Sequence, residues 1–210
     1  MEVEQRSSDK ASQEMIRHMA EAGQQNAWDR LEAQSPQCGF GKQGICCRIC
    51  SMGPCRISKK APLGVCGADA DTIVARNFLR AIAAGASAHS DHGRGVAEVF
   101  LATAQGEAPG YQIKDKAKLN ALAQELNIKT EGRSIKEIAA DVGKLALGEF
   151  GKWEGKQWMA KRAPKARQEI WEKEGIMPRA VDREIVEALH RTHMGVDQDP
   201  VNLMQQGSRC

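Results

Sequence analysis

The stretch CGFGKQGICCRICSMGPCRISKKAPLGVCG, residues 38–67, decides how the rest of the chain is interpreted. It holds six of the seven cysteines in the 210 residues, among glycines and prolines that favour turns over regular structure. A loop of about 30 residues with no core of its own is unusual inside a compact domain unless something else holds it. A metal centre would hold it, and we therefore predict a metal-binding loop at residues 36–67.

The rest of the sequence indicates a compartment in which thiols stay reduced. The N-terminus is charged and lacks the apolar segment of a secretory signal, and no apolar run approaches the roughly 18 residues that span a bilayer. We expect a cytoplasmic protein without a membrane span, whose cysteines stay reduced and serve as metal ligands rather than disulfides. The net charge of +3 gives no reason to expect a nucleic-acid partner.

Four of the cysteines have spacing that suits an iron–sulfur site. Cys47 and Cys50 make a C-x2-C pair that can wrap two corners of a cluster, and Cys55 and Cys66 can supply the other two. The alternative is a structural zinc site. Zinc sites usually show two such pairs, whereas this loop has one, so the spacing favours a [4Fe-4S] cluster over zinc.

The other two cysteines of the loop, Cys38 and Cys46, remain outside that set. Cys46 directly precedes Cys47, and neighbouring side chains in an extended chain point in different directions, so these two are better placed to serve separate centres. Because two cysteines are half a ligand set, a twofold homodimer would complete four ligands at its axis. The division of the six loop cysteines into four and two predicts one cluster in each subunit and one shared between subunits.

The remainder of the chain is predicted to be all-α, because no run of alternating β-branched residues suggests a sheet. We divide it into a tail and helix at 1–35, the cluster loop at 36–67, and a helical domain at 68–210 that is interrupted at its C-terminus. Helices are expected at about 8–34, 72–105, 114–126, 134–150, 156–174 (broken or kinked at Pro164), 180–194 and from 200 onward. Their start signals are Asp69 or Asp71, Ser134 with Glu137, and Asp199 with Pro200.

The helix at 72–105 carries residues spaced three or four apart, which we interpret as one inward-facing stripe. Two members of the stripe, His89 and His92, could be buried and hydrogen-bonded or could transfer protons, with Asp91 and Arg94 setting their charge. His190 and His193 are interpreted as structural. The stripe consists of Val74, Phe78, Ile82, Gly85, His89, His92, Val96 and Val99.

Basic residues surround the cysteine loop. The simpler interpretation is a solvated basic face, and the alternative is a landing patch for an acidic electron carrier. The residues are Arg48, Arg56, Lys59 and Lys60.

CGFGKQGICCRICSMGPCRI (38–57) and GVCGADADTIVARNFLRAIAAGASAHSDHGR (64–94) resemble the N-terminal region of anaerobic nickel–iron carbon monoxide dehydrogenases. The resemblance continues through AEVFLATAQGEAPGYQIKD (97–115) and DREIVEALHRTHMGVDQD (182–199), which look closest to the dehydrogenase subunit of bacterial carbon monoxide dehydrogenase/acetyl-CoA synthase complexes.

The resemblance implies roles for individual residues. Cys47, Cys50, Cys55 and Cys66 match the ligands of a [4Fe-4S] cluster inside each subunit, and Cys38 and Cys46 match the ligands of a [4Fe-4S] cluster that bridges two subunits. His89 and His92 match a proton path near the nickel–iron cluster. Where some members carry two further histidines, this chain has Gly95 and Glu98.

The resemblance also implies what lies elsewhere. The family binds nickel in following Rossmann-like domains, so we expect no nickel ligands in this chain, no activity of the chain alone, and no family role for Cys210. The implied reaction is the oxidation of CO by water to CO2, with electrons passed to a ferredoxin-like acceptor. The implied partners are a second subunit and an acetyl-CoA synthase. Alternatives are a free-standing iron–sulfur electron-transfer module and a zinc-stabilised structural domain.

Overall fold

The computed structural model describes residues 2–210. The chain forms two compact units, one ending at Gln43 and the other spanning Gly44–Cys210. The boundary falls inside the predicted cluster loop. Among the described residues, no helix combines the length and the apolar character needed to cross a bilayer.

The described residues of the first unit form four short helices, and two of these replace the single helix predicted at 8–34. A glycine with a φ of +67°, Gly23, follows the second helix, and Asn26 then caps the third by accepting hydrogen bonds from two backbone N–H groups. The prediction of one continuous helix was wrong because Gly23 ends one helix and Asn26 starts the next. The helices are α1 (Val3–Arg6), α2 (Lys10–Glu21), α3 (Ala27–Ala33) and α4 (Gly39–Lys42).

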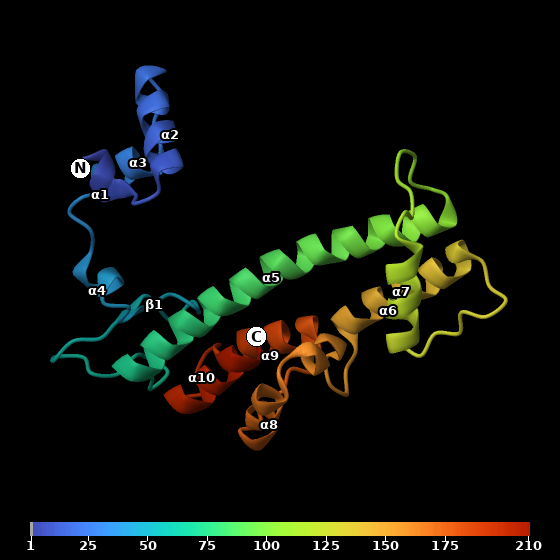
Figure 1. The fold of residues 1–210 in the computed structure, drawn as a ribbon. Helices are drawn as coiled ribbons and strands as arrows, with labels where there is room; N and C mark the ends of the chain where they lie inside the picture. The colour runs from blue at the N-terminus through green and yellow to red at the C-terminus, as the bar shows by residue number, and fades with distance from the viewer. Residues whose placement is uncertain (1) are drawn as a thin grey trace. The chain divides into compact units, whose positions relative to one another are not determined.

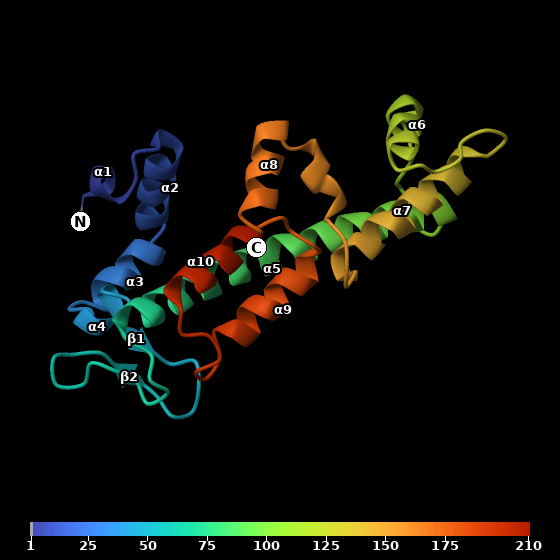
Figure 2. The same ribbon diagram turned by 90° about the horizontal axis from the view of Figure 1, so that it is seen from below.

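The second unit is all-α apart from two very short strands, so the predicted fold class is confirmed. Its long helix α5 is contacted by α7, α9 and α10, while α6 packs on α7 (Figures 1 and 2). The elements are β1 (Cys46–Cys47), β2 (Cys55–Arg56), α5 (Ala70–Gln105), α6 (Lys116–Glu125), α7 (Ile135–Gly151), the 3-10 helix η1 (Trp158–Arg162), α8 (Lys165–Lys173), α9 (Val181–Arg191) and α10 (Pro200–Arg209).

The helix starts follow the predicted capping residues. The Asp69 carboxylate accepts a hydrogen bond from the Thr72 N–H at 2.8 Å, which places the start of α5 at Ala70. Ser134 forms a reciprocal capping box at the start of α7, and Pro200 is the first residue of α10. These ends are encoded within three or four residues, and for that reason the sequence predicts them well.

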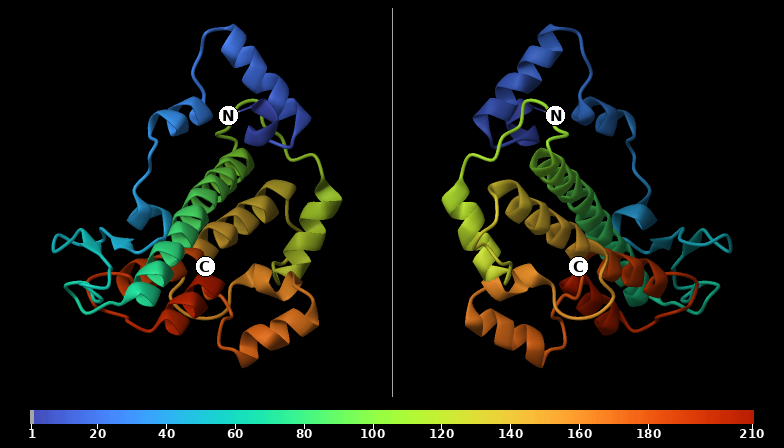
Figure 3. Two further views of the ribbon diagram at one scale, coloured as in Figure 1. Left: turned by 90° about the vertical axis from the view of Figure 1, so that its left-hand side faces the viewer. Right: turned by 90° about the vertical axis from the view of Figure 1, so that its right-hand side faces the viewer.

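Two separate clusters of buried residues pack against α5, one near each of its ends. Near its start, small and branched side chains of α5 pack against α9 and α10: the buried residues are Ala75, Leu79, Ala83, Ala188 and Leu203. At its other end, α5 packs with α6 and α7 (Figure 3): the buried residues are Ala104, Leu119, Ala123, Ile138, Ala139 and Val142.

The stripe predicted to face inward is the exposed face of α5. Val74, Phe78 and Val96 are 42%, 53% and 61% exposed, and His89 and His92 are exposed as well. The buried face carries Leu79 and Ala83 instead. The prediction was wrong because α5 is apolar on two faces, and the positions of α7, α9 and α10 decide which of them is covered.

A chain of ion pairs runs along α9 toward the segment that follows it. Arg179 bonds Glu184 and Glu187, and Arg191 bonds both Glu187 and the Asp197 carboxylate, each at 2.6–2.8 Å. Burial raises the pKa of Glu187, but the hydrogen bonds from the two arginines lower it by more and bring the pKa to about 2. The carboxylate is therefore held in its charged form.

Acid should weaken this network. Glu187 has a pKa of about 2 in the folded chain against an ordinary 4.5, so its contribution to stability is complete above the ordinary value and is lost as the pH falls through about 2. We expect Glu187→Gln to be less stable than the parent near neutral pH, with a difference that shrinks across this range. Urea unfolding of both proteins at each pH measures it, and a difference that stays constant with pH would contradict the assignment.

Candidate metal centre

The two short strands set the directions of the first cysteines. β1 and β2 pair antiparallel, with Cys47 opposite Cys55 and Cys46 opposite Arg56. Directly opposed residues project from the same face of a strand pair, and successive residues project from opposite faces. Cys47 and Cys55 therefore share one face, and Cys46 points to the other, as the sequence predicts for cysteines that serve separate centres.

A tight turn between the strands requires glycine. A Cβ atom on Gly53 would lie 2.9 Å from the Cys47 carbonyl oxygen and 3.1 Å from the Cys55 nitrogen, so a side chain does not fit there. The absence of a side chain lets the chain fold back between the two cysteines. A side chain at position 53 would therefore disturb the pairing of Cys47 with Cys55.

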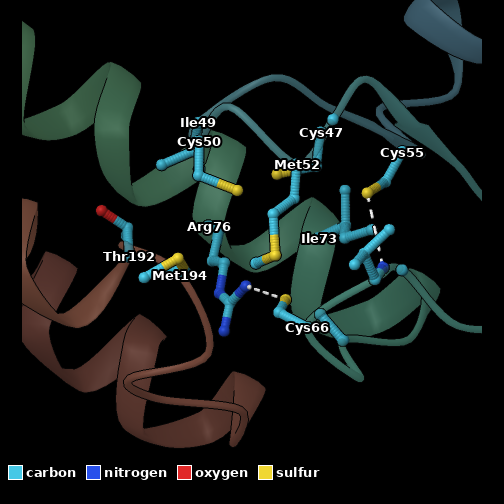
Figure 4. Close-up of a pocket in the computed structure, with 14 residues that line it drawn as sticks. Cys47, Ile49, Cys50, Met52, Cys55, Cys66, Ile73, Arg76, Thr192 and Met194 are labelled. Carbon is cyan, nitrogen blue, oxygen red and sulfur yellow. Dashed lines mark hydrogen bonds between the residues drawn. The ribbon is translucent and has the colours of Figure 1, made fainter.

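Cys47, Cys50, Cys55 and Cys66 line one pocket (Figure 4). They come from β1, the turn after it, β2, and the segment before α5. Apolar side chains, including Ile49, Met52 and Ile73, line the same pocket and limit access of water to it. The structure thus brings together the four cysteines that the sequence groups into one set.

Two hydrogen bonds reach the sulfur atoms. The Val65 N–H donates to Cys55 Sγ, and Arg76 Nη1 donates to Cys66 Sγ, each at 3.5 Å (Figure 4). Burial raises the pKa of the Cys66 thiol, but Arg76 and the Ala68 backbone N–H lower it by more, so its pKa lies below the ordinary value. The lowered pKa favours the thiolate form of Cys66, which is the form that binds metal.

A distant segment closes the pocket, which the sequence analysis missed. Thr192 and Met194 line it from the loop between α9 and α10. Gln198 Nε2 donates to the Cys66 carbonyl at 2.9 Å, and Thr72 Oγ1 donates to the Gln198 carbonyl at 2.8 Å. These contacts join residues more than 120 positions apart, and no local pattern in the sequence indicates them.

The donor set suits an iron–sulfur cluster. In a cubane cluster each cysteine binds a different iron, so four thiols around an apolar pocket, with N–H donors to two of the sulfur atoms, suit that group.

The other cysteines of the second unit, Cys46 and Cys210, are not among the residues that line this pocket. Cys46 is half-buried, and its carbonyl accepts a hydrogen bond from Asn77 Nδ2 at 3.1 Å. Cys38 is exposed in the first unit, directly before α4. Cys210 packs against the buried residues between α5, α9 and α10, where burial raises the pKa of its thiol to about 11. Cys210 therefore stays protonated and has no place among the pocket thiols.

The predicted histidine and basic residues lie on the surface of the described chain. His89 and His92 are exposed on α5, and His190 and His193 are exposed near the end of α9. Arg94 is expected from the sequence to set the charge of the two histidines on α5. In the structure its guanidinium donates to both Asp182 carboxylate oxygens, at 2.9 and 3.0 Å. The basic side chains around the cysteine loop are exposed, as predicted for Arg48, Arg56, Lys59 and Lys60.

Known proteins resemble this chain over most of its length. Residues 45–210 match the family described as Prismane/CO dehydrogenase. Carbon monoxide dehydrogenase 1 of Methanosarcina mazei is 52% identical over 208 residues, which cover 98% of this chain and 33% of that protein. Carbon monoxide dehydrogenase/acetyl-CoA synthase subunit beta of Moorella thermoacetica is 41% identical over 184 residues, 85% of this chain and 27% of that protein.

The fold is similar as well. The Ni-free crystal structure of carbon monoxide dehydrogenase from Thermococcus sp. AM4 matches with a TM-score of 0.86 at 51% identity, over 94% of this chain and 32% of that one. The chain spans about a third of the length of the relatives it matches. On the family match, the identities and the shared fold, this chain belongs to the Prismane/CO dehydrogenase family.

Proposed function

We propose that this chain is the iron–sulfur electron-transfer and dimerisation region of an anaerobic carbon monoxide dehydrogenase. The reaction is CO + H2O → CO2 + 2 H+ + 2 e−, with nickel bound by parts of the protein outside this chain. The observation that carries the proposal is the pocket in which Cys47, Cys50, Cys55 and Cys66 meet. The similarity to proteins named carbon monoxide dehydrogenase supports this reaction.

The residues of the pocket suit one-electron transfer. A [4Fe-4S] cluster, when bound, accepts and releases one electron at a time. The four thiolates would hold it in place, while Ile49, Met52 and Ile73 keep water away. The exposed basic side chains Arg48 and Lys59 lie on the same loop, and we propose that they attract an acidic, ferredoxin-like acceptor.

The proposed protein is a cytoplasmic homodimer, with an acetyl-CoA synthase as a further partner. Support for that partner comes from the similarity to a subunit named for both activities. The direct test is the full-length protein, purified without oxygen. Iron and acid-labile sulfide together with CO-dependent reduction of a viologen dye support the proposal. If the protein contains iron and sulfide but CO does not reduce the dye, the proposed dehydrogenase activity is rejected and the alternative of a free-standing electron-transfer module remains.

Cys38 and Cys46 are proposed to bind the cluster shared between subunits. Their support is that Cys46 projects away from Cys47 and lies outside the four-cysteine pocket. We expect Cys38→Ser to lose about half a cluster of iron per chain, to weaken the dimer, and to keep the pocket cluster. Iron analysis with native mass spectrometry measures both effects. Unchanged iron content and an unchanged dimer would reject the assignment.

His89 and His92 are proposed to carry protons away from the catalytic site. Both are exposed on the same helix one turn apart, so they are accessible to residues outside this chain. In the full-length protein, we expect His89→Ala to slow CO oxidation by about 100-fold, the lower range for loss of a general acid–base group, without loss of iron. His193→Ala, another exposed histidine, is the control. Equal turnover in the His89 and His193 variants would assign His89 no role in proton transfer.

A further inference from the structure

One arginine is buried at the edge of the four-cysteine pocket. Arg76 is 1% exposed, and it is the only Lys, Arg, Asp or Glu among the described residues that line the pocket. Its Nη1 donates to Cys66 Sγ at 3.5 Å (Figure 4). Its Nε and Nη2 donate to the Asp197 carbonyl oxygen at 3.2 and 2.6 Å. The Asp197 carbonyl thus fixes the guanidinium on one side, and the opposite side faces the Cys66 sulfur.

The charge of Arg76 is not matched by a carboxylate. Across residues 2–210 its partners are a thiol and a backbone carbonyl, and the nearby Asp197 carboxylate is bonded by Arg191 at 2.8 Å. A buried charge is costly unless an opposite charge accompanies it. Four cysteine thiolates and the cluster they bind carry net negative charge, so the pocket supplies the missing counter-charge when it is filled.

We propose that Arg76 sets the reduction potential of the cluster in this pocket by stabilising its reduced form; this rests on the proposed function, because it requires the cluster to be there. Reduction adds one electron, and therefore one negative charge, to the cluster. A guanidinium that donates to a ligand sulfur stabilises the more negative state and raises the potential. Arginine stays protonated in proteins, so the charge of Arg76 is the same before and after reduction.

The chain offers a matched control one turn along the same helix. Arg80 Nε donates to Thr192 Oγ1 at 2.9 Å, so Arg80 also joins α5 to the end of α9, but it does not line the pocket. The variants are Arg76→Gln, Arg76→Lys and Arg80→Gln in the full-length protein. The cluster is identified by the electron paramagnetic resonance signal that disappears in Cys50→Ser, and its potential is measured by redox titration of that signal.

Arg76→Gln is expected to make reduction about tenfold less favourable, which is about 59 mV toward more negative potential for one electron. Arg76→Lys keeps the charge and should lie nearer to the parent, and Arg80→Gln should leave the potential unchanged. Full iron content with an unchanged potential in Arg76→Gln would overturn the role of Arg76 and leave the proposed function intact. A parent protein without the Cys50-dependent signal would overturn the proposed function itself.

A second measurement covers the case in which Arg76→Gln fails to retain iron. Parent protein labelled with 15N in arginine should show, by pulsed electron paramagnetic resonance, a nitrogen coupled to the reduced cluster. The coupling should vanish in Arg76→Lys and persist in Arg80→Gln. A parent protein with the Cys50-dependent signal but no such coupling would overturn the proposal.

Discussion

Replacing Cys50 by serine is expected to empty the four-cysteine pocket, with a loss of about four iron atoms per chain. Cys50 lines the pocket with three other cysteines, and each is expected to bind one iron. A serine hydroxyl has nearly the same size but stays protonated at neutral pH and is a poor ligand for iron in such a cluster. In the full-length protein, electron delivery from CO to a dye should fall to background, because no fifth cysteine is among the described residues that line the pocket.

The control for this experiment is Cys210→Ser. Cys210 is a half-buried thiol outside the pocket, and its raised pKa, about 11, keeps it protonated. Iron, sulfide and dye reduction should therefore match those of the parent. If Cys50→Ser retained the full iron content, the four-cysteine assignment would be wrong, and if Cys210→Ser lost as much iron, the loss would reflect general damage to thiols.

Glu184→Ala is expected to destabilise the second unit by about 3 kcal/mol, or about 6–12 °C in Tm for a chain of this size. Glu184 is 2% exposed and accepts hydrogen bonds from Arg179 Nε, Arg179 Nη2 and Gln206 Nε2 at 2.7, 2.8 and 3.0 Å. Burial raises the pKa of Glu184, but these bonds lower it by more, so the side chain stays ionised. Its removal leaves the fully buried Gln206 amide without this acceptor.

Two variants test the reason for that loss. Glu184→Gln keeps the size and an acceptor oxygen but removes the charge, so it should lose less stability than Glu184→Ala. Glu125→Ala breaks an exposed ion pair with Arg162 and should change Tm little. Thermal unfolding of the three variants ranks them. Equal losses in the Glu184→Ala and Glu125→Ala variants would show that burial of the carboxylate does not matter.

The sequence predicts features that are encoded over a few residues. The Asp69 cap and the Ser134–Glu137 capping box mark helix starts where the structure has them, because each requires only a side chain and the next turn of backbone. The grouping of Cys47, Cys50, Cys55 and Cys66 follows from spacing along one loop, and the structure places them in one pocket.

Features that depend on distant partners could not be predicted in this way. The covered face of α5 is chosen by α9 and α10, so the apolar residues Val74 and Phe78 are exposed in spite of their regular spacing. Arg76 lies in an apolar helical stretch, and a single sequence does not tell whether its side chain reaches solvent or sulfur. Its partners, Cys66 and Asp197, become neighbours only after the chain has returned to the start of α5.

The contribution of Thr192 and Met194 to the cysteine pocket fixes an order of events during synthesis. A ribosome releases the N-terminal part first, so the cysteines of residues 46–66 emerge well before the segment that closes their pocket. During that interval Arg76 lacks the Asp197 carbonyl, and the thiols are open to oxidation. The complete pocket therefore forms only after the end of α9 has been translated.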